Sequence, residues 1–441
     1  MKKTQRVITF VTAFSTSLFA GWSSTSLATN GYFQHGYGAK SSALAGAGVA
    51  FSQDAMDAAS NPANMVMVGD DRQLGLTLFS PMRDYTVTGA PTGFPDTFGL
   101  FAGSVESENE LFLIPNFGRN WMLSSDSSIG LTIYGNGGMN TEWDADDVDP
   151  FGFGTYGAGT AGVDLSQLFI NTTYSRKINP TASWGVSGIV AYQTFEAKGI
   201  ASFTNVSNDP ANLSNNGHDD GFGFGVKAGI TGELAPNFFL GASYQSEIKM
   251  SEFDDYAGLF AEEGDFDIPS TFSVGLAYKN TSSSAILFDI QRINYSDIKA
   301  INNPILPNFG ICATRMTPTN PSCLGGSDGI GFGWEDVTVY RIGYQWSTGN
   351  DWTWRAGFST LDQPIPESEV LFNILAPGVV EEHFTGGFSK DLGNNSAIDV
   401  SFMYAPNTKV SGPNPLEAPG AQEIDLEMKQ FALSVNWSKR F

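Results

Sequence analysis

Apolar side chains occupy every second position in one segment after another, from about residue 72 to the end of the chain. The last strand-like run shows the pattern most clearly, with Phe431, Leu433, Val435 and Trp437 separated by small or polar residues. A period of two places alternate side chains on opposite faces of an extended chain. The pattern therefore predicts β-strands with one apolar face and one polar face.

We count about 14 such segments, an even number as in single-chain outer-membrane barrels. A soluble β-sandwich also alternates, but its second face needs a core or solvated charges. Here the apolar faces carry almost no charge, and the opposite faces carry Gly, Ser and a few charges. Tyr and Trp gather at the strand ends, as in aromatic girdles. We predict an all-β fold, a 14-stranded antiparallel transmembrane β-barrel over residues 72–441.

The first 71 residues follow other patterns. Residues 1–28 combine a basic start, a short apolar run and small residues before Ala28, which predicts a cleaved export signal peptide. A membrane anchor helix is the alternative, although the run is short for one. Residues 29–71 are rich in Ala and other small residues, which predicts one or two short helices that pack closely against another part of the protein.

Composition and charge narrow the class further. The formal net charge of −23 makes nucleic acid an improbable partner. Aromatic residues make up 13% of the chain, which excludes a disordered acidic protein. The two cysteines, Cys312 and Cys323, lie in one loop-like segment of an exported chain, so we expect a disulfide, with two unpaired thiols as the alternative. No third Cys or His lies nearby, so we expect no metal site there.

Several stretches, in order, resemble the FadL-type family of outer-membrane transporters of hydrophobic molecules. They are Asn61-Pro62-Ala63, then NGGMNTEW (136–143), IPSTFSVGLAY (268–278), GFGWEDVTVYRIGYQW (331–346), WRAGFSTLDQPIP (354–366), FNILAPGVVEEHFTGGFS (372–389) and IDVSFMYAP (398–406). They are spread along the chain from residue 61 to residue 406, so the resemblance runs over essentially the whole mature chain. The resemblance implies a 14-stranded barrel plugged by a small, mainly helical hatch, here residues 29–71 with the Asn61, Pro62 and Ala63 motif.

The resemblance also implies a route for the ligand through the protein. Long-chain fatty acids or aromatic hydrocarbons would bind inside the barrel and leave sideways into the membrane, through a gap at a kink in the third strand. Gly135, Asn136, Gly137 and Gly138 fall on that strand, where glycines weaken pairing and permit a bend. An ordinary turn near a loop is the alternative interpretation.

A buried fatty-acid carboxylate needs a cationic partner. Lys and Arg are scarce, and Arg341 and Arg355 fall on the lumen face of their strands by parity. They are the candidate ligand-binding cations, unless lumen carboxylates such as Asp289 or Asp399 hold them in internal salt bridges. An aromatic hydrocarbon needs no cation.

The segment 362–383 is long for a hairpin connection and contains Phe372 and Leu375, our apolar ligand-binding candidates. It forms an apolar landing groove outside, packs into the barrel mouth, or does both.

We expect a passive, monomeric channel without cofactor or metal, not an enzyme. Its expected partners are the hydrophobic ligand, outer-membrane lipid, lipopolysaccharide and the assembly machinery that recognises a terminal aromatic residue such as Phe441. A general diffusion porin and a barrel lipase are the alternatives of other classes. The three histidines lie in no nucleophile-elbow or zinc-protease motif.

Overall fold

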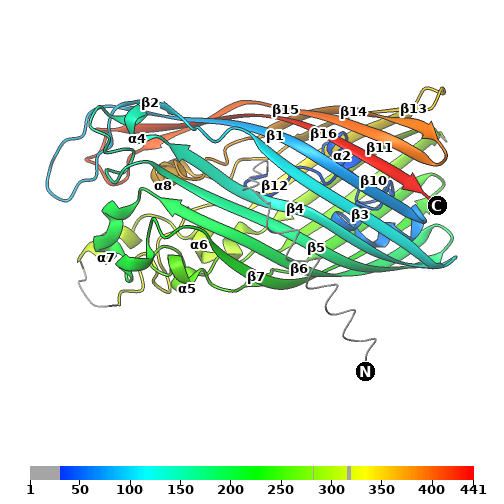
Figure 1. The fold of residues 1–441 in the computed structure, drawn as a ribbon, viewed down its shortest axis with the longest axis horizontal. Helices are drawn as coiled ribbons and strands as arrows, with labels where there is room; N and C mark the ends of the chain where they lie inside the picture. The colour runs from blue at the N-terminus through cyan, green and yellow to red at the C-terminus, as the bar shows by residue number, and fades with distance from the viewer. Residues whose placement is uncertain (1–29, 282, 315–318) are drawn as a thin grey trace.

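The structure, a computed structural model, describes residues 30–281, 283–314 and 319–441. Within them, fourteen long strands form one closed antiparallel wall, since β1 pairs with both β3 and β16 (Figure 1). The wall strands are β1 (Asp71–Thr88), β3 (Phe112–Ser124), β4 (Ser127–Trp143), β5 (Ala161–Asn179), β6 (Ala182–Lys198), β7 (Asp219–Ala235), β8 (Phe238–Gln245), β10 (Thr271–Thr281), β11 (Ser284–Ile293), β12 (Val337–Ser347), β13 (Trp352–Thr360), β14 (Glu382–Gly393), β15 (Ser396–Pro413) and β16 (Glu423–Arg440). The predicted 14-stranded barrel is confirmed.

The two ends of the barrel differ. At one end, the turn end, short turns such as residues 125–126 and 180–181 join neighbouring strands. The other, the loop end, carries long connections and most of the short helices (Figure 1). These connections contain β2 (Gly103–Glu106), α4 (Ala145–Val148), η3 (Ala201–Val206), η4 (Pro210–Asn212), β9 (Lys249–Met250), η5 (Asp254–Tyr256), α5 (Ala261–Gly264), η6 (Tyr295–Asp297), α6 (Lys299–Asn302), α7 (Asn308–Thr314), η7 (Glu367–Glu369) and α8 (Val370–Asn373).

The alternating sequence separates an apolar exterior from a polar lumen. On β1, Leu74 is 58% exposed on the outside, whereas Gln73 and Thr77 are buried on the inside. At the turn end, aromatic pairs such as Tyr344–Trp346 and Trp352–Trp354 stack along the wall. An apolar outer face with an aromatic rim is what lipid contact requires. In the described ranges, no helix has the length and apolar character needed to cross a bilayer.

The last strand closes the wall and ends at its rim. The β16 strand pairs with β1 from Glu423 to Arg440, and the C-terminus lies at the turn end (Figure 1). Phe441 donates its backbone N–H to the carbonyl oxygen of Asp70 at 3.1 Å. The Arg119 guanidinium lies 4.4 Å from the centre of the Phe441 ring. The terminal aromatic residue is therefore held at the rim, and 63% of its surface is exposed.

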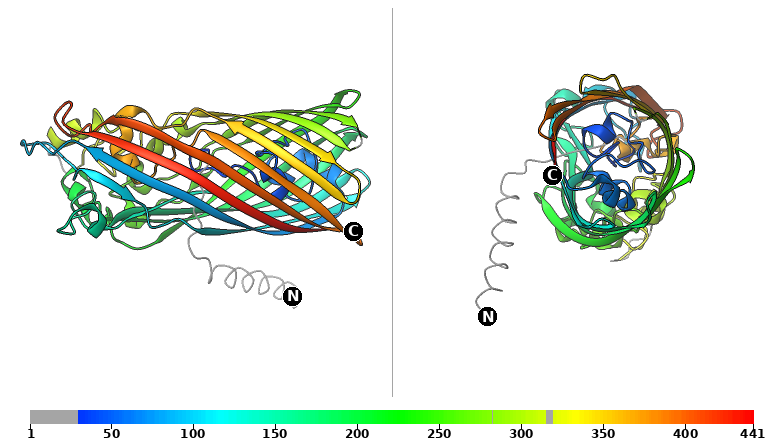
Figure 2. Two further views of the ribbon diagram at one scale, coloured as in Figure 1. Left: turned by 90° about the horizontal axis from the view of Figure 1, so that it is seen from above. Right: turned by 90° about the vertical axis from the view of Figure 1, so that its right-hand side faces the viewer.

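Residues 30–70 lie inside the barrel (blue in Figure 2). They form α2 (Ala39–Ser42), η1 (Asp57–Ala59), η2 (Pro62–Asn64) and α3 (Met65–Val68) before β1 begins at Asp71. Their alanines are almost all fully buried, because small side chains let the backbone approach the wall. We call residues 30–70 the hatch. The expected export peptide, residues 1–28, lies outside the described residues.

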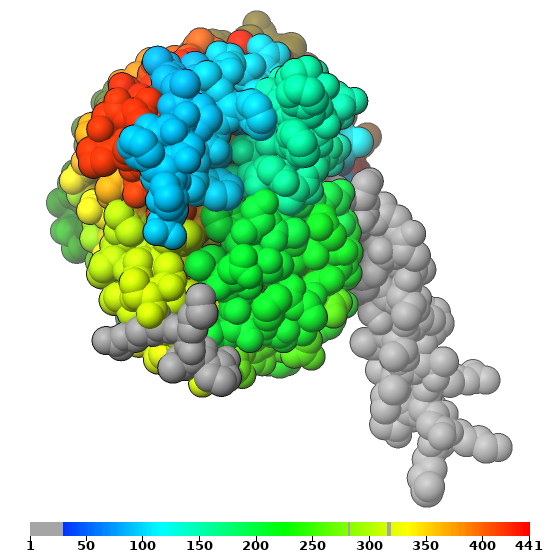
Figure 3. All heavy atoms as spheres, turned by 90° about the vertical axis from the view of Figure 1, so that its left-hand side faces the viewer, coloured from blue at the N-terminus to red at the C-terminus, as the bar shows by residue number. Residues whose placement is uncertain are grey.

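The loop end is filled by side chains rather than open. Loops from different parts of the chain meet over it (Figure 3), and beneath them lies a large cluster of buried aromatic and aliphatic residues. In the connection between β11 and β12, the structure joins Cys312 of α7 to Cys323 by a disulfide, with the two Cα atoms 4.9 Å apart. The buried cluster thus sits between the hatch and the loops, inside the wall.

Candidate ligand path

The third wall strand, β4, is bent where the sequence places its glycines. Its register with β5 shifts by one residue between Gly135 and Gly137, so Asn136 is the extra residue of a β-bulge. Pairing with β3 on the other side stops at Tyr134, which lies opposite Asn116. Toward the loop end, contact on that side resumes where the Glu108 N–H donates to the carbonyl oxygen of Glu142 at 2.9 Å. The stretch between, residues 112–115 of β3 and 135–141 of β4, is called the lateral window below.

The start of the hatch pairs with the bent strand from inside. The N–H of Gln34 donates to the Asn136 carbonyl at 2.8 Å, and the N–H of Gly138 donates to the Tyr32 carbonyl at 3.0 Å. A side chain on Gly137 would collide with that same carbonyl of Tyr32. Glycine at position 137 is therefore what lets the hatch backbone reach the window.

The hatch is also bound to the wall strands β5, β6 and β7 through Asn61 and Ala63. The Asn61 amide donates to the carbonyls of Val49 at 2.8 Å and Ile230 at 3.2 Å, and its oxygen accepts the Ala63 N–H at 3.0 Å. Ser175 and Ser183 donate to the Ala63 carbonyl at 3.0 and 2.6 Å. These bonds tie the motif to β5, β6 and β7.

An apolar cavity of about 40 Å³ lies at the loop end. Phe372 and Leu375 line it together with Val163, Phe195, Ile200, Phe203, Leu259, Phe260, Ala300, Leu324, Ile330, Gly331 and Phe332. The connection that carries Phe372 and Leu375 is folded into the barrel mouth, with Leu371, Ile374 and Val379 fully buried. Of the two interpretations of this segment, packing into the mouth is observed, because its apolar side chains find partners there rather than facing solvent.

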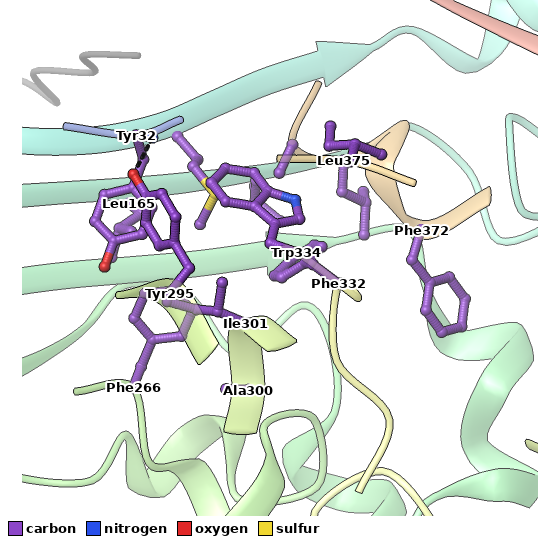
Figure 4. Packing of buried hydrophobic residues seen from close by; sticks show 14 of the residues in the cluster. Tyr32, Leu165, Phe266, Tyr295, Ala300, Ile301, Phe332, Trp334, Phe372 and Leu375 are labelled. Carbon is purple, nitrogen blue, oxygen red and sulfur yellow. Dashed lines mark hydrogen bonds between the residues drawn. The ribbon is translucent and has the colours of Figure 1, made fainter. Parts of the chain in front are cut away.

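An aromatic cluster separates this cavity from the start of the hatch. Trp334 lies between the tyrosines Tyr32 and Tyr295 on one side and Leu375 on the other (Figure 4). The ring centres of Tyr295 and Trp334 are 5.2 Å apart and the rings meet at 89°. The Tyr295 hydroxyl accepts the Tyr32 N–H at 3.2 Å and donates to the Asn30 carbonyl, and burial raises the pKa of Tyr295 well above its usual value. The hydroxyl therefore stays neutral and serves as a donor.

Sequence reasoning missed this cluster. Tyr32 and Tyr295 are 263 positions apart, and neither lies in an alternating run that would mark it as a wall residue. Trp334 falls within a stretch that resembles the family, but the resemblance gives no contact for it. Only the tertiary fold brings the three rings together.

The two candidate cations lie apart from Phe372 and Leu375, in other cavities. Arg341 donates to the Gln291 side chain at 2.7 Å and borders a cavity of about 30 Å³ between hatch and wall, together with Lys227. Arg355 donates to Ser389 at 2.7 Å and borders a cavity of about 470 Å³ at the turn end. As predicted by parity, both side chains face the lumen and are buried.

The internal salt bridges considered for these arginines are not formed with any residue that the structure describes. Asp289 instead accepts the N–H groups of Gly48 and Val49 of the hatch, at 2.7 and 2.9 Å. Asp399 lies 3.7 Å from the ammonium group of Lys40. The lumen carboxylates thus hold the hatch, which leaves Arg341 and Arg355 with neutral hydrogen-bond partners.

The chain matches, over residues 23–441, the family described as outer membrane protein transport protein (OMPP1/FadL/TodX). The chain belongs to this family. It is therefore an outer-membrane channel that transports hydrophobic compounds, and not an enzyme. In this membrane the loop end faces the outside and the turn end faces the periplasm. Among the described residues, no group of three or more His, Cys, Asp or Glu side chains is placed to hold a metal ion.

Two curated relatives are long-chain fatty acid transport proteins of Escherichia coli. The protein of the O6:H1 strain is 24% identical over 423 residues, covering 89% of this chain and 90% of the relative. That of strain K12 is 22% identical over 422 residues, covering 84% and 87%. The resemblance inferred from the sequence is confirmed at the level of the family.

Two solved structures share the fold. A Pseudomonas aeruginosa FadL homologue superposes with a TM-score of 0.66 at 16% identity, covering 93% of this chain and all of the homologue. The Pseudomonas putida toluene transporter TodX gives 0.63 at 18% identity, covering 92% and 99%. The FadL-type channel therefore has relatives whose names refer to fatty acids and others whose names refer to an aromatic hydrocarbon.

Proposed function

We propose that this FadL-type channel takes up long-chain fatty acids and releases them sideways into the membrane through the lateral window. The observation that carries the proposal is the bulge at Asn136, where β4 leaves β3 beside the buried aromatic cluster. If the wall opens at this place, the opening leads from an apolar interior to lipid. The names of the curated relatives support the fatty acid as the substrate.

The driving force needs no energy input. Transfer of each methylene group from water into an apolar site contributes roughly 0.8 kcal/mol, so a long acyl chain gains strongly from apolar surroundings. The cavity of about 40 Å³ lined by Phe372 and Leu375 offers such surroundings once its side chains move apart to admit the chain. Release into the bilayer spares the ligand a return to water. Uptake is then downhill diffusion between apolar sites.

An aromatic hydrocarbon of the toluene type is the second candidate. The described residues that line the apolar cavity at the loop end include no charged side chain, and a neutral ring needs none. The structural similarity to a toluene transporter favours the same alternative. The two substrates differ in one chemical feature, the carboxylate.

Uptake measurements in a strain without its own fatty acid transporter separate the candidates. We expect cells that produce this channel to take up labelled oleate faster than cells with the empty vector, and to gain little toluene uptake. Planar bilayers provide the control for a porin, since the hatch-filled barrel is expected to carry no steady ion current. Toluene uptake without oleate uptake would select the second candidate.

Inside the barrel, we propose Arg341 as the first candidate partner of the carboxylate and Arg355 as the second. Both guanidinium groups donate to neutral side chains, Gln291 and Ser389, and neither forms an ion pair with a described carboxylate. Asp289 acts on Arg341 and Asp399 acts on Arg355 only electrostatically. Because a hydrogen bond to a charged group contributes about 1.5–3 kcal/mol, Arg341→Gln is expected to weaken oleate binding roughly tenfold or more. Binding to the purified protein in detergent measures this. If Arg341→Gln and Arg355→Gln both bind oleate like the wild type, the assignment is wrong.

Contacts with the surrounding membrane complete the proposal. The aromatic rim at the turn end suits an interface with lipid, and the exposed Phe441 at the end of β16 is the residue that assembly machinery is proposed to recognise. At the loop end the wall is proposed to contact lipopolysaccharide. In the described part of the chain, the wall closes on itself through β1 and β16 and needs no strand from a second copy, which supports a monomer.

A further inference from the structure

Arg83 is a buried cation with an incomplete set of partners. It lies on the lumen face of β1 and is 3% exposed. One terminal nitrogen, Nη1, donates to the carbonyl of Asn109 at 3.3 Å, whereas Nη2 has no partner among the residues that the structure describes. Glu110 is the carboxylate that acts on Arg83 electrostatically, but it forms no ion pair with it. Burial of a guanidinium with an unused N–H donor is unfavourable unless another group accepts a hydrogen bond from it.

Arg83 lies at the lateral window. Pairing of β1 with β3 stops at Phe79 opposite Phe112, four residues before Arg83. Arg83 then shares a cavity of about 10 Å³ with Met139, Asn140 and Thr141 on the bent part of β4. The Asn140 side-chain oxygen is also buried, and no described residue donates a hydrogen bond to it. Two unpartnered polar groups thus face one small space at the edge of the window.

The cavity that Arg83 borders lies next to the aromatic cluster. Trp334 and residues 376–378 form its other side, and Ala376 follows directly on Leu375 of the loop-end cavity. The Thr141 hydroxyl donates to the Leu375 carbonyl at 2.7 Å, which fixes this connection against β4. Arg83 thus lies on the side of the aromatic cluster where a ligand would move from the apolar cavity toward the window.

We propose that Arg83 binds the carboxylate of the fatty acid at the exit, as a specificity-determining residue of the lateral window. If the acyl chain enters the bilayer before the headgroup does, the carboxylate is the last part of the ligand to leave the barrel. At that point the carboxylate lies beside the guanidinium of Arg83. A carboxylate can accept from Nη2 in a charge-assisted hydrogen bond, which neither an ester nor a hydrocarbon can match. This inference rests on the proposed function, but it assigns a site distinct from Arg341 and Arg355, which border other cavities.

The test compares oleate with methyl oleate, two probes that differ in the charge of the headgroup. Arg83→Met is expected to lower the initial rate of oleate uptake roughly tenfold, the value of a lost charge-assisted hydrogen bond, and to leave methyl oleate uptake unchanged. Arg83→Lys is expected to restore part of the oleate rate. The matched control is Arg292→Met, since Arg292 is an exposed arginine at the loop end that pairs with Asp336 at 2.7 Å.

Each outcome decides the inference. If the wild type takes up oleate and Arg83→Met takes up both probes at the wild-type rate, the inference is overturned while the proposed function stands. An equal loss of both probes in a correctly folded variant, checked by heat-modifiable migration, also overturns it, because Arg83 then has only a structural role. If the wild type takes up neither probe, the proposed function itself has failed.

A second variant keeps the test valid if Arg83→Met does not assemble. Asn140→Asp places a fixed carboxylate in the cavity that Arg83 borders, where it competes with the headgroup. It is expected to slow oleate and spare methyl oleate in the same way. Unchanged oleate uptake in a folded Asn140→Asp channel contradicts the proposal.

Discussion

Deleting Asn136 is expected to reduce oleate uptake to the level of cells without the channel. Asn136 is the extra residue of the bulge, and without it the register between β4 and β5 runs through from Gly135 to Gly137. A straight β4 can extend its pairing to residues 112–115 of β3. The lateral window then closes with backbone hydrogen bonds.

The same deletion removes the contacts through which Asn136 holds neighbouring parts. Its side chain accepts from the Tyr37 hydroxyl at 3.1 Å and donates to Gln167 at 3.0 Å, and its carbonyl accepts the Gln34 N–H. Oleate binding to the purified variant is expected to persist, because the apolar cavity at the loop end lies outside the bulge. Loss of uptake with retained binding identifies the window as the exit.

The matched control is a deletion at another bulge of the wall. In β15 the register with β16 shifts between Ala405 and Thr408, and Asn407 of that bulge is exposed. Deleting Asn407 is expected to leave uptake near the wild-type rate. Wild-type oleate uptake in the folded Asn136 deletion would show that the ligand leaves by another way, for instance through the turn end.

The wall could be predicted from the sequence because one physical requirement repeats along it. Each strand must present apolar side chains to lipid and other side chains to the lumen, so a period of two fixes both the strands and the parity of residues such as Arg341 and Arg355. The count of fourteen followed from the number of alternating runs. The bend in the third strand followed from its glycines together with the family resemblance.

The interior could not be predicted in the same way, because it depends on where strand pairing stops and on contacts between distant segments. Parity places Arg83 in the lumen, but nothing in the sequence shows that β1 and β3 separate four residues before it. The cluster of Tyr32, Tyr295 and Trp334 likewise has no periodic signal. For the segment around Phe372, composition left two environments open, and only packing against the other loops selects the buried one.

Deleting Asn61, Pro62 and Ala63 is expected to turn a closed barrel into one that passes ions. The motif carries the hatch's contacts to three wall strands, through the Ile230 carbonyl and the hydroxyls of Ser175 and Ser183. Glycines in the wall allow the hatch to come this close, since a side chain on Gly185 would collide with Pro62 and one on Gly229 would collide with Asn61. Without the motif, the hatch loses these hydrogen bonds to β5, β6 and β7, and water can enter between hatch and wall.

The measurement is the steady current of single channels in planar bilayers, together with oleate uptake in cells. The wild type is expected to show no steady current, and the deletion variant to show discrete open levels. A matched control removes the same residue types from the loop end, by deleting Pro210, Ala211 and Asn212 of η4, and is expected to stay closed. If removing Asn61–Ala63 changes neither current nor uptake, the motif does not hold the hatch in the closed position. The bonds to the Ile230 carbonyl, Ser175 and Ser183 would then be dispensable for closure, and the hatch would be retained by its remaining contacts, such as those of Gly48 and Val49 with Asp289.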